Sequence, residues 1–361
     1  MNKQNKYFMD SVKGIFDFRG KKISIIDKNK FVTNPVLMLM TYRLAFQLGC
    51  NIDKRTMASI KKCARFIKKA DPEKIKNEIF LILSFERSSG IFLALHKSGI
   101  MRYVIPELSI LENKAQCYYK HLGLLGHCFS AMGKMEEFYN KFFKNIFPAY
   151  ANKIRVHLDL PISKTITRKN LLKFACLLHD IGKPASSKTI NKRLRFFGHE
   201  DRGCEIIENI SGRLCLSNDE KRYLKQMTKH HMRIGNLTSA QELTDKASFR
   251  FFRDIGEDTV DVILLSIADA YTYPASAVRT KHKIIGAELL KKYYSRKKKA
   301  VHKKLVNGFD IMKWLKIAPC PAVGDILKKI EKLQISGKIN NKKDANAYAV
   351  KIWARQKKSL Q

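Results

Sequence analysis

The chain is poor in acidic residues and rich in basic ones. Its 361 residues include 32 Asp or Glu against 70 Lys or Arg, which gives a net charge of +38. Such a surface attracts polyanions, RNA and DNA among them, and binds them in a strongly salt-dependent way. A lysine-rich genome that fills solvated helix faces with Lys would leave the same excess, so the charge alone does not identify a partner.

Long apolar runs, paired cysteines and a signal sequence are also missing. No uncharged stretch approaches the roughly 18 residues that a membrane span needs. The N-terminal MNKQNKYFMD has no apolar region of the kind found in signal peptides. The eight cysteines are scattered without a Cys-x-x-Cys pair, which favours free thiols over a disulfide framework or a zinc knuckle. We therefore expect a cytoplasmic protein that has no contact with a membrane.

The sequence contains no glycine-rich phosphate loop, and strand patterns are scarce beyond its first residues. Residues 10–27 predict a short β-like stretch with glycine turns. After it, apolar residues recur with a helical period, which predicts helices over 34–49, 53–66 and 88–108, and another that begins at Asp71-Pro72. At 45% hydrophobic residues the chain can bury a sizeable core. We therefore predict an all-α fold.

The most informative stretch is LLKFACLLHDIGKP, residues 171–184. Its apolar first half predicts a buried helix that places His179 and Asp180 at its C-terminal end. Gly182 fits the position just past a helix end, and Pro184 prevents continuation. Burying a carboxylate beside a histidine is costly unless a cation compensates it, and a divalent metal ion does so best.

Further histidines and one more aspartate lie at the ends of apolar helices between residues 119 and 276. A lone histidine on an apolar face is most often a core residue, but a set of this size favours a metal site. Neutral imidazoles and carboxylates suit a hard or borderline divalent ion. Water bound to such an ion has a lowered pKa and can attack phosphorus. The additional candidates are His127, His199, His230, His231 and Asp269.

The order His127, His179-Asp180, Asp269 resembles the HD superfamily of metal-dependent phosphohydrolases. The resemblance implies that these four residues bind a divalent ion such as Mg²⁺, Mn²⁺, Ni²⁺ or Co²⁺. It also implies that His179, Asp180 and Lys183 are catalytic residues and that Lys183 lies near the substrate phosphate. The histidines expected to bind a second metal ion or the phosphate are His199, His230 and His231.

A wider resemblance extends over nearly the whole chain. It is similar to the neck, body, HD domain and tail of bacterial CCA-adding tRNA nucleotidyltransferases of the poly(A) polymerase-like class. The segments that carry this resemblance are 34–53, 72–79, 98–108, 198–207, 254–270 and 305–330. It implies a remnant of the edge of the head domain at 1–27, an RNA-binding neck and body of helices at 28–118, a helical HD domain at 119–290, and a basic linker and helical tail at 291–361.

RNA, above all tRNA, is the partner that this resemblance implies. In the tail we expect Asn307 and Gly308 to contact RNA, together with three lysines of the basic run before it, Lys297, Lys298 and Lys299. Three residues near the start of the HD domain could stack on RNA bases or pack in the core: Tyr118, Tyr119 and His121.

The chain departs from that family at the head and the neck. The family's head carries a Gly-Ser turn and two metal-binding aspartates, and nothing of that kind precedes Asp10. Asn34 and Leu37 stand where the family has an Asp and an Arg that read the incoming base, and leucine lacks arginine's donors. Gly123 replaces an aspartate usual before the first HD histidine. We therefore expect no nucleotide addition by this chain alone.

Two functions follow from these observations. The first is a metal-dependent phosphohydrolase, a phosphatase or phosphodiesterase that acts on RNA 3′ ends or nucleotides. The alternative is the tRNA-binding subunit of a split CCA-adding tRNA nucleotidyltransferase whose catalytic head is a separate protein. A fragment without activity is a third reading, against which the complete set of HD residues argues.

Overall fold

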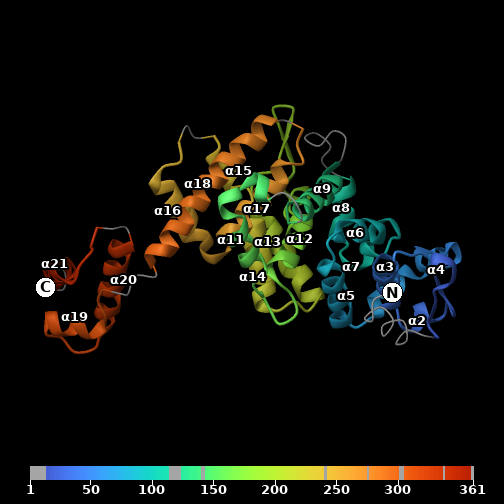
Figure 1. Cartoon of the computed structure of the whole chain (residues 1–361), viewed down its shortest axis with the longest axis horizontal. Coiled ribbons are helices and arrows are strands. Elements are labelled where there is room, and N and C mark those ends of the chain that lie inside the picture. The colour runs from blue at the N-terminus through green and yellow to red at the C-terminus, as the bar shows by residue number, and fades with distance from the viewer. Residues whose placement is uncertain are drawn as a thin grey trace. The chain divides into compact units, whose positions relative to one another are not determined.

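The computed structural model describes residues 14–113, 123–139, 143–239, 242–274, 276–300, 305–335 and 338–358. These residues are predominantly helical, which confirms the predicted all-α class (Figure 1). They form two compact units, Met1–Ala287 and Glu288–Gln361. Among the described residues, no helix is both long and apolar enough to cross a membrane. Tyr118, Tyr119 and His121 lie outside the described residues.

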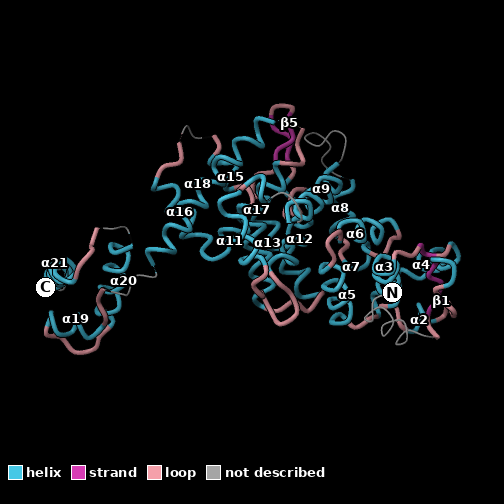
Figure 2. The backbone as a smooth tube through the Cα atoms, viewed as in Figure 1, coloured by secondary structure: helices cyan, strands magenta, loops and turns pink. Residues whose placement is uncertain are grey.

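Short strands occur at two places within the first unit (Figure 2). In the first sheet β1 (Phe16–Asp17) pairs antiparallel with β2 (Lys22–Ile25), which pairs parallel with β3 (Asn51–Ile52). The second is the hairpin of β4 (Lys188–Ile190) and β5 (Arg193–Arg195). Strands of two or three residues are too short to show an alternating pattern, so the sequence did not predict β3, β4 and β5.

The first helices of the chain confirm the predicted ends at Gly49, Asp53 and Asp71, but the helix predicted over 53–66 ends at Cys63 and is followed by a 3₁₀ helix. They are α2 (Lys30–Thr33), α3 (Leu37–Leu48), α4 (Lys54–Cys63), the 3₁₀ helix η2 (Ala64–Lys69) and α5 (Pro72–Ser84). Gly49, in the left-handed conformation (φ 63°), ends α3. The carboxylates of Asp53 and Asp71 accept backbone N–H bonds at the starts of α4 and α5.

The single helix predicted over 88–108 is wrong. The structure has α6 (Ser88–Lys97), α7 (Met101–Val104) and α8 (Glu107–Asn113) there. Gly99 adopts φ +85°, which breaks the chain between the first two. The helical period continues across the breaks because all three bury their apolar side chains, among them Leu95, Met101 and Leu108.

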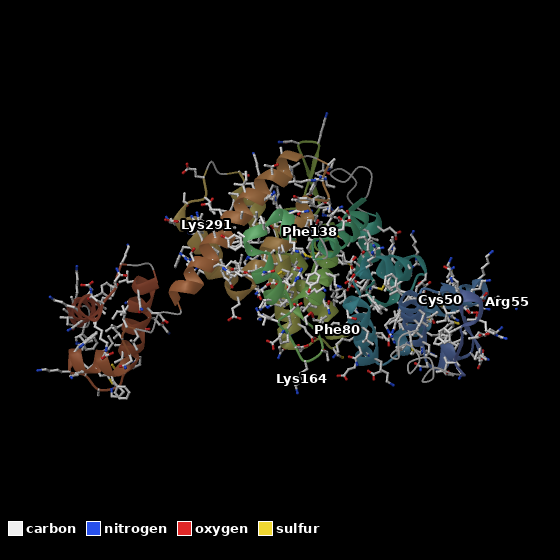
Figure 3. The ribbon with its side chains drawn as sticks, in the orientation of Figure 1. Cys50, Arg55, Phe80, Phe138, Lys164 and Lys291 are labelled. Atoms are coloured by element: carbon white, nitrogen blue, oxygen red, sulfur yellow. The ribbon has the colours of Figure 1, made fainter. Side chains whose placement is uncertain are left out.

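Further helices begin in the first unit, and the last of them continues past Ala287 into the second unit. They are α9 (Gly123–Glu137), α10 (Phe143–Ile146), α11 (Ala151–Leu158), α12 (Arg168–Leu178), α13 (His199–Arg213), α14 (Asn218–His230), α15 (Arg233–Leu237), α16 (Asp245–Ile255), α17 (Thr259–Ala270) and α18 (Ser276–Ala300). The central α12 packs against α9, α14 and α17, and its residues 171–178 are buried. Figure 3 shows Phe80 and Phe138 among the helices, whereas Arg55 and Lys164 point outward.

Lys173, the charged residue in the apolar face of α12, joins this helix to α5. Its ammonium group is buried and donates hydrogen bonds to the carbonyl oxygens of Leu83 and Phe85, the latter at 2.8 Å. Those carbonyls belong to the C-terminal end of α5, which attracts cations. Burial lowers the pKa of Lys173 to about 8, although the charge of Glu136 raises it.

A buried ion network holds the N-terminal end of α12. The guanidinium of Arg168 lies 2.8 Å from the carboxylates of both Asp258 and Asp261. Asp261 also accepts hydrogen bonds from His157 Nε2 at 2.5 Å and from the Tyr223 hydroxyl at 2.7 Å. These five side chains come from four helices and the 3₁₀ turn before α17, so the network fixes the helices that surround α12.

The tail unit contains α19 (Gly308–Leu315), α20 (Pro321–Ile335) and α21 (Lys342–Lys358). Its helices enclose a small apolar core of their own, with Ile311, Ile326 and Ala345 at its centre. Asn307 and Asp310 form a capping box at the start of α19, in which each side chain accepts the other's backbone N–H.

We expect Arg168→Ala to destabilise the protein by about 3–5 kcal/mol, because it removes the buried cation that Asp258 and Asp261 share. Only Asp258 then keeps an ion pair with another arginine, Arg222. Arg202→Ala, which removes an exposed ion pair with Glu205, is the matched control and should cost less than about 1 kcal/mol. Urea unfolding followed by circular dichroism measures both. Equal midpoints for the two variants would contradict the role given to the network.

Candidate metal centre

Six of the predicted site residues converge in the first unit. They come from the ends or first turns of five helices. His127 lies on α9, His179 and Asp180 directly after α12, His199 at the start of α13, His231 directly after α14, and Asp269 near the end of α17. They form two groups of three, and within each group the ligand atoms lie within 4.8 Å of one another.

The first group consists of His127, His179 and Asp269. The Nε2 atom of His127 lies 3.3 Å from His179 Nε2 and 3.1 Å from Asp269 Oδ1. The distance from His179 Nε2 to the same carboxylate oxygen is 3.9 Å. Both imidazoles are fully buried, so three potential ligand atoms face one small volume that is shielded from solvent.

The second group consists of Asp180, His199 and His231. The Nε2 atoms of the two imidazoles lie 3.2 Å apart. Asp180 Oδ1 lies 3.3 Å from His231 Nε2 and 3.7 Å from His199 Nε2.

Asp180 connects the two groups. While its Oδ1 atom faces His199 and His231, its Oδ2 atom lies 3.3 Å from His179 Nε2 and 3.5 Å from His127 Nε2. The carboxylate is 1% exposed. One carboxylate thus presents an oxygen to each group, the arrangement in which a carboxylate can bridge two ions.

Hydrogen bonds fix the protonation of the ring nitrogens that face away from the site. The Nδ1 atoms of three histidines lie 2.7–2.8 Å from backbone carbonyl oxygens, which can only accept: His179 with Cys176, His199 with Phe196, and His231 with Thr228. In each neutral ring, therefore, Nδ1 carries the proton and Nε2 keeps its lone pair.

Thr272 fixes the fourth imidazole in the same way. Its hydroxyl lies 2.7 Å from the carbonyl oxygen of Asp269, to which it donates, and 2.9 Å from His127 Nδ1. Because the hydroxyl proton is used, the oxygen accepts from the N–H of His127. The sequence analysis missed Thr272, since a threonine after an apolar helix gives no signal of this contact.

The two groups fit divalent cations. Lone pairs on facing Nε2 atoms repel each other and also repel the carboxylates, unless a cation lies among them. The Oδ1 atom of Asp269 is buried, yet it accepts no hydrogen bond of good geometry from the described residues. Imidazoles oriented through Nδ1–H bonds to protein oxygens are the usual form of histidine ligands in metal sites.

The pKa shifts agree with ionised carboxylates and mostly neutral imidazoles. Burial opposes ionisation of Asp269, but His127 and His179 lower its pKa to about 2. Burial lowers the pKa values of His127 and His199 below their usual range. In His179 burial acts the same way, but the charge of Asp180 outweighs it and raises the pKa.

Lys183 lies beside the bridging carboxylate. Its Nζ atom is 2.6 Å from Asp180 Oδ2, and the side chain is largely buried. Burial lowers the pKa of this lysine, but the charge of Asp180 outweighs that effect and raises it, so Lys183 stays protonated. The structure thus places the predicted lysine at the site.

Gly182 allows the segment after α12 to approach α13 closely. The sequence analysis assigned it to a position past a helix end, where a positive φ is required, but its φ is not positive. A Cβ atom at this position would instead overlap the His199 carbonyl oxygen and lie 2.5 Å from the Gly203 amide nitrogen. The glycine is needed because His199 must come within reach of Asp180.

Other predicted residues lie elsewhere. His230 is outside both groups, and burial lowers its pKa with help from the charge of Arg233. In the tail, the side chain of Asn307 caps α19, of which Gly308 is the first residue. The backbone of Lys297, Lys298 and Lys299 continues α18, and their side chains lie outside the described ones.

Family models match three overlapping or neighbouring parts of the chain. The model described as "Probable RNA and SrmB- binding site of polymerase A" matches residues 49–111. The "HD domain" model matches 149–274, and the model "tRNA nucleotidyltransferase domain 2 putative" matches 214–347. The HD match contains five of the six grouped side chains, and His127 lies before it.

Two relatives with similar sequences are tRNA nucleotidyltransferases. The A-adding tRNA nucleotidyltransferase of Deinococcus radiodurans is 21% identical over 363 residues, which cover 98% of this chain and 76% of that protein. The CC-adding tRNA nucleotidyltransferase of Thermus thermophilus is 23% identical over 342 residues, which cover 92% of this chain and 70% of the relative.

A solved structure, that of a CCA-adding enzyme in complex with CTP, shares the fold. It aligns with 93% of this chain at a TM-score of 0.54 and 12% identity, and this chain spans 64% of that enzyme's chain. The predicted resemblance is confirmed: the chain contains an HD domain and is similar over nearly its whole length to the body, HD and tail region of CCA-adding tRNA nucleotidyltransferases.

Proposed function

We propose that this protein is a divalent-metal-dependent phosphohydrolase that cleaves phosphate esters of RNA 3′ ends or nucleotides at its HD site. The observation that carries the proposal is the position of Asp180, whose two carboxylate oxygens each face a separate pair of imidazole Nε2 atoms. Two ions held close together suit phosphate ester hydrolysis, in which both the attacking and the leaving oxygen need stabilisation.

The residues of the site have separate roles in this proposal. His127, His179, Asp180 and Asp269 hold one ion, and Asp180, His199 and His231 hold the second. When bound, the ions supply a water of lowered pKa and neutralise charge on the phosphate. Histidine-rich ligand sets favour borderline ions, so Mn²⁺, Co²⁺ and Ni²⁺ should bind more tightly than Mg²⁺.

Lys183 keeps the bridging carboxylate ionised and adds positive charge to the site. Its ammonium group contacts Asp180 Oδ2 at 2.6 Å, and it carries further N–H donors besides the one that this contact uses. A phosphoryl oxygen within reach of those donors would gain a charge-assisted hydrogen bond. The lysine thus positions Asp180 and supports the developing charge on phosphate.

The adjacent histidines of α14 offer a matched test of the ligand set. We expect His231→Ala to weaken Mn²⁺ binding at one of the two sites at least tenfold, because it removes an Nε2 atom from the second group. His230→Ala should leave binding unchanged, since that imidazole lies outside both groups. Isothermal titration calorimetry measures both variants. Equal losses of affinity in the two would contradict the assignment.

We expect Asp180→Ala to abolish metal-dependent hydrolysis while the protein remains folded, because both ions lose a ligand. The assay measures phosphate release and cyclic phosphodiester opening with Mg²⁺, Mn²⁺, Ni²⁺ or Co²⁺ added in turn. Asp201→Ala, which removes an exposed carboxylate paired with Lys229, is the control and should retain activity. Full turnover by the Asp180 variant would exclude this site as the catalytic one.

A second candidate function is binding of tRNA as the subunit of a split CCA-adding enzyme whose catalytic head is a separate partner protein. The match of residues 49–111 to an RNA-binding model and the net charge of +38 favour it. In this function the grouped histidines take no part in RNA binding, which does not depend on metal ions.

For this second function we expect tRNA affinity to fall steeply with salt. A protein that contacts 6–10 phosphates loses about 10³- to 10⁵-fold in affinity between about 50 and 200 mM salt. Filter binding over that range, with and without EDTA, measures the effect. Absence of tRNA binding at low salt would exclude this function. If the protein both binds tRNA and hydrolyses phosphate esters, it has both proposed functions.

A further inference from the structure

The β4–β5 hairpin leaves the metal centre and returns to it. It follows the segment that carries Asp180 and Lys183, turns at Asn191 and Lys192, and ends one residue before Phe196. The carbonyl oxygen of Phe196 accepts the Nδ1–H bond of His199, and the Phe196 ring lies 5.8 Å from Lys183 Nζ. Figure 2 shows the hairpin projecting from the helices.

This segment carries only positive charge. Residues 183–197 contain five basic residues and no acidic one. Lys188 and Lys192 are exposed, and neither takes part in an ion pair with any residue that the structure describes. Elsewhere in the same unit, the partly exposed Lys221 and Lys225 are paired with a carboxylate, that of Glu208. The hairpin therefore offers cations that are available to a polyanion.

Phe197 is exposed beside the site. Its side chain is 75% exposed, among the highest values for a large apolar residue in the described chain. Gly198, in the left-handed conformation (φ 72°), follows it, and His199 comes next. An exposed aromatic ring two residues from a histidine of the candidate metal site lacks the stabilisation that burial would give it, and a base that stacked on the ring would bury it.

We infer that Phe197 and the hairpin lysines form a subsite for single-stranded nucleic acid, in which a base stacks on Phe197 and adjoining phosphates contact Lys188 and Lys192. Aromatic rings next to cations are the usual means by which proteins hold single strands. The inference rests on the proposed function, because it places the scissile phosphate at the metal centre. It assigns the substrate class: phosphate esters that carry a nucleobase, in preference to base-free esters.

The first test measures stacking directly and does not depend on turnover. A short single-stranded RNA with 2-aminopurine at its 3′ end and a terminal phosphate loses fluorescence when that base stacks. We expect quenching on binding to the intact protein, retention of quenching in Phe197→Trp, and its loss in Phe197→Ala, with affinity ~10-fold weaker. Phe249→Ala, which removes another exposed phenylalanine of the same unit, is the control and should behave as the wild type.

The second test measures selectivity. The ratio of kcat/KM for the RNA 3′-phosphate to that for glycerol phosphate should fall ~10-fold in Phe197→Ala, through a higher KM for the RNA. Lys188→Gln combined with Lys192→Gln should reduce the slope of log affinity against log salt by about 1.4, since each phosphate contact to a single strand contributes about 0.7.

The two tests separate the failure of the inference from that of the proposed function. If the wild type and Phe197→Ala show equal quenching and equal ratios of kcat/KM for the two substrates, the inference of a subsite is overturned, even if metal-dependent hydrolysis is present. If no phosphate ester is hydrolysed, the proposed function fails, whereas quenching that is lost in Phe197→Ala would still support the subsite.

Discussion

The structure depends on the burial of one carboxylate. Asp180 is 1% exposed, and a carboxylate placed there without compensation would cost several kcal/mol. Lys183 supplies one positive charge at 2.6 Å. The remaining neighbours are imidazole nitrogens whose lone pairs point towards the carboxylate, which repel it instead of stabilising it. Cations among these groups resolve the conflict, so the folded arrangement of five helix ends is itself an argument for metal binding.

The helices α12 and α17 bring their ends together at Asp180 because they contact each other both near their starts and near their ends. Arg168 at the start of α12 contacts Asp261 near the start of α17, and His179 just after α12 faces Asp269 near the end of α17. The two helices therefore run parallel, with the buried ion network at one end and the metal centre at the other. Three of the histidines use the same local device: each donates from Nδ1 to the carbonyl three residues earlier. The helix end thus sets the orientation of each ring before any ion binds.

Many of the helices and most of the candidate ligands could be predicted from the sequence, and the features that could not be predicted have physical reasons. Apolar periodicity and capping residues located most helices, but not the breaks at Gly99, because the buried face continues across them. The order of His127, His179, Asp180 and Asp269 indicated the candidate ligands through its resemblance to the HD superfamily. His230 and His231 could not be separated, because neighbours differ by about 100° in direction and only the packing of α14 decides which one faces the site. The ligand roles remain predictions that metal titration tests.

Residues 34–43 bear on why we propose the HD site, and not this segment, as the place of the chemistry. Leu37 is 5% exposed and packs in the core, so it offers no donor to a base. Asn34 is the C-terminal capping residue of α2. Arg43, a nearby arginine that could have replaced the missing donor, is buried and bound to Glu78, with Nε 2.6 Å from the carboxylate. At these positions an incoming nucleotide therefore finds no free guanidinium, and only the amide of Asn34 remains as a side-chain donor. At the HD site, by contrast, imidazoles, carboxylates and a lysine converge, which is why we propose phosphate chemistry there.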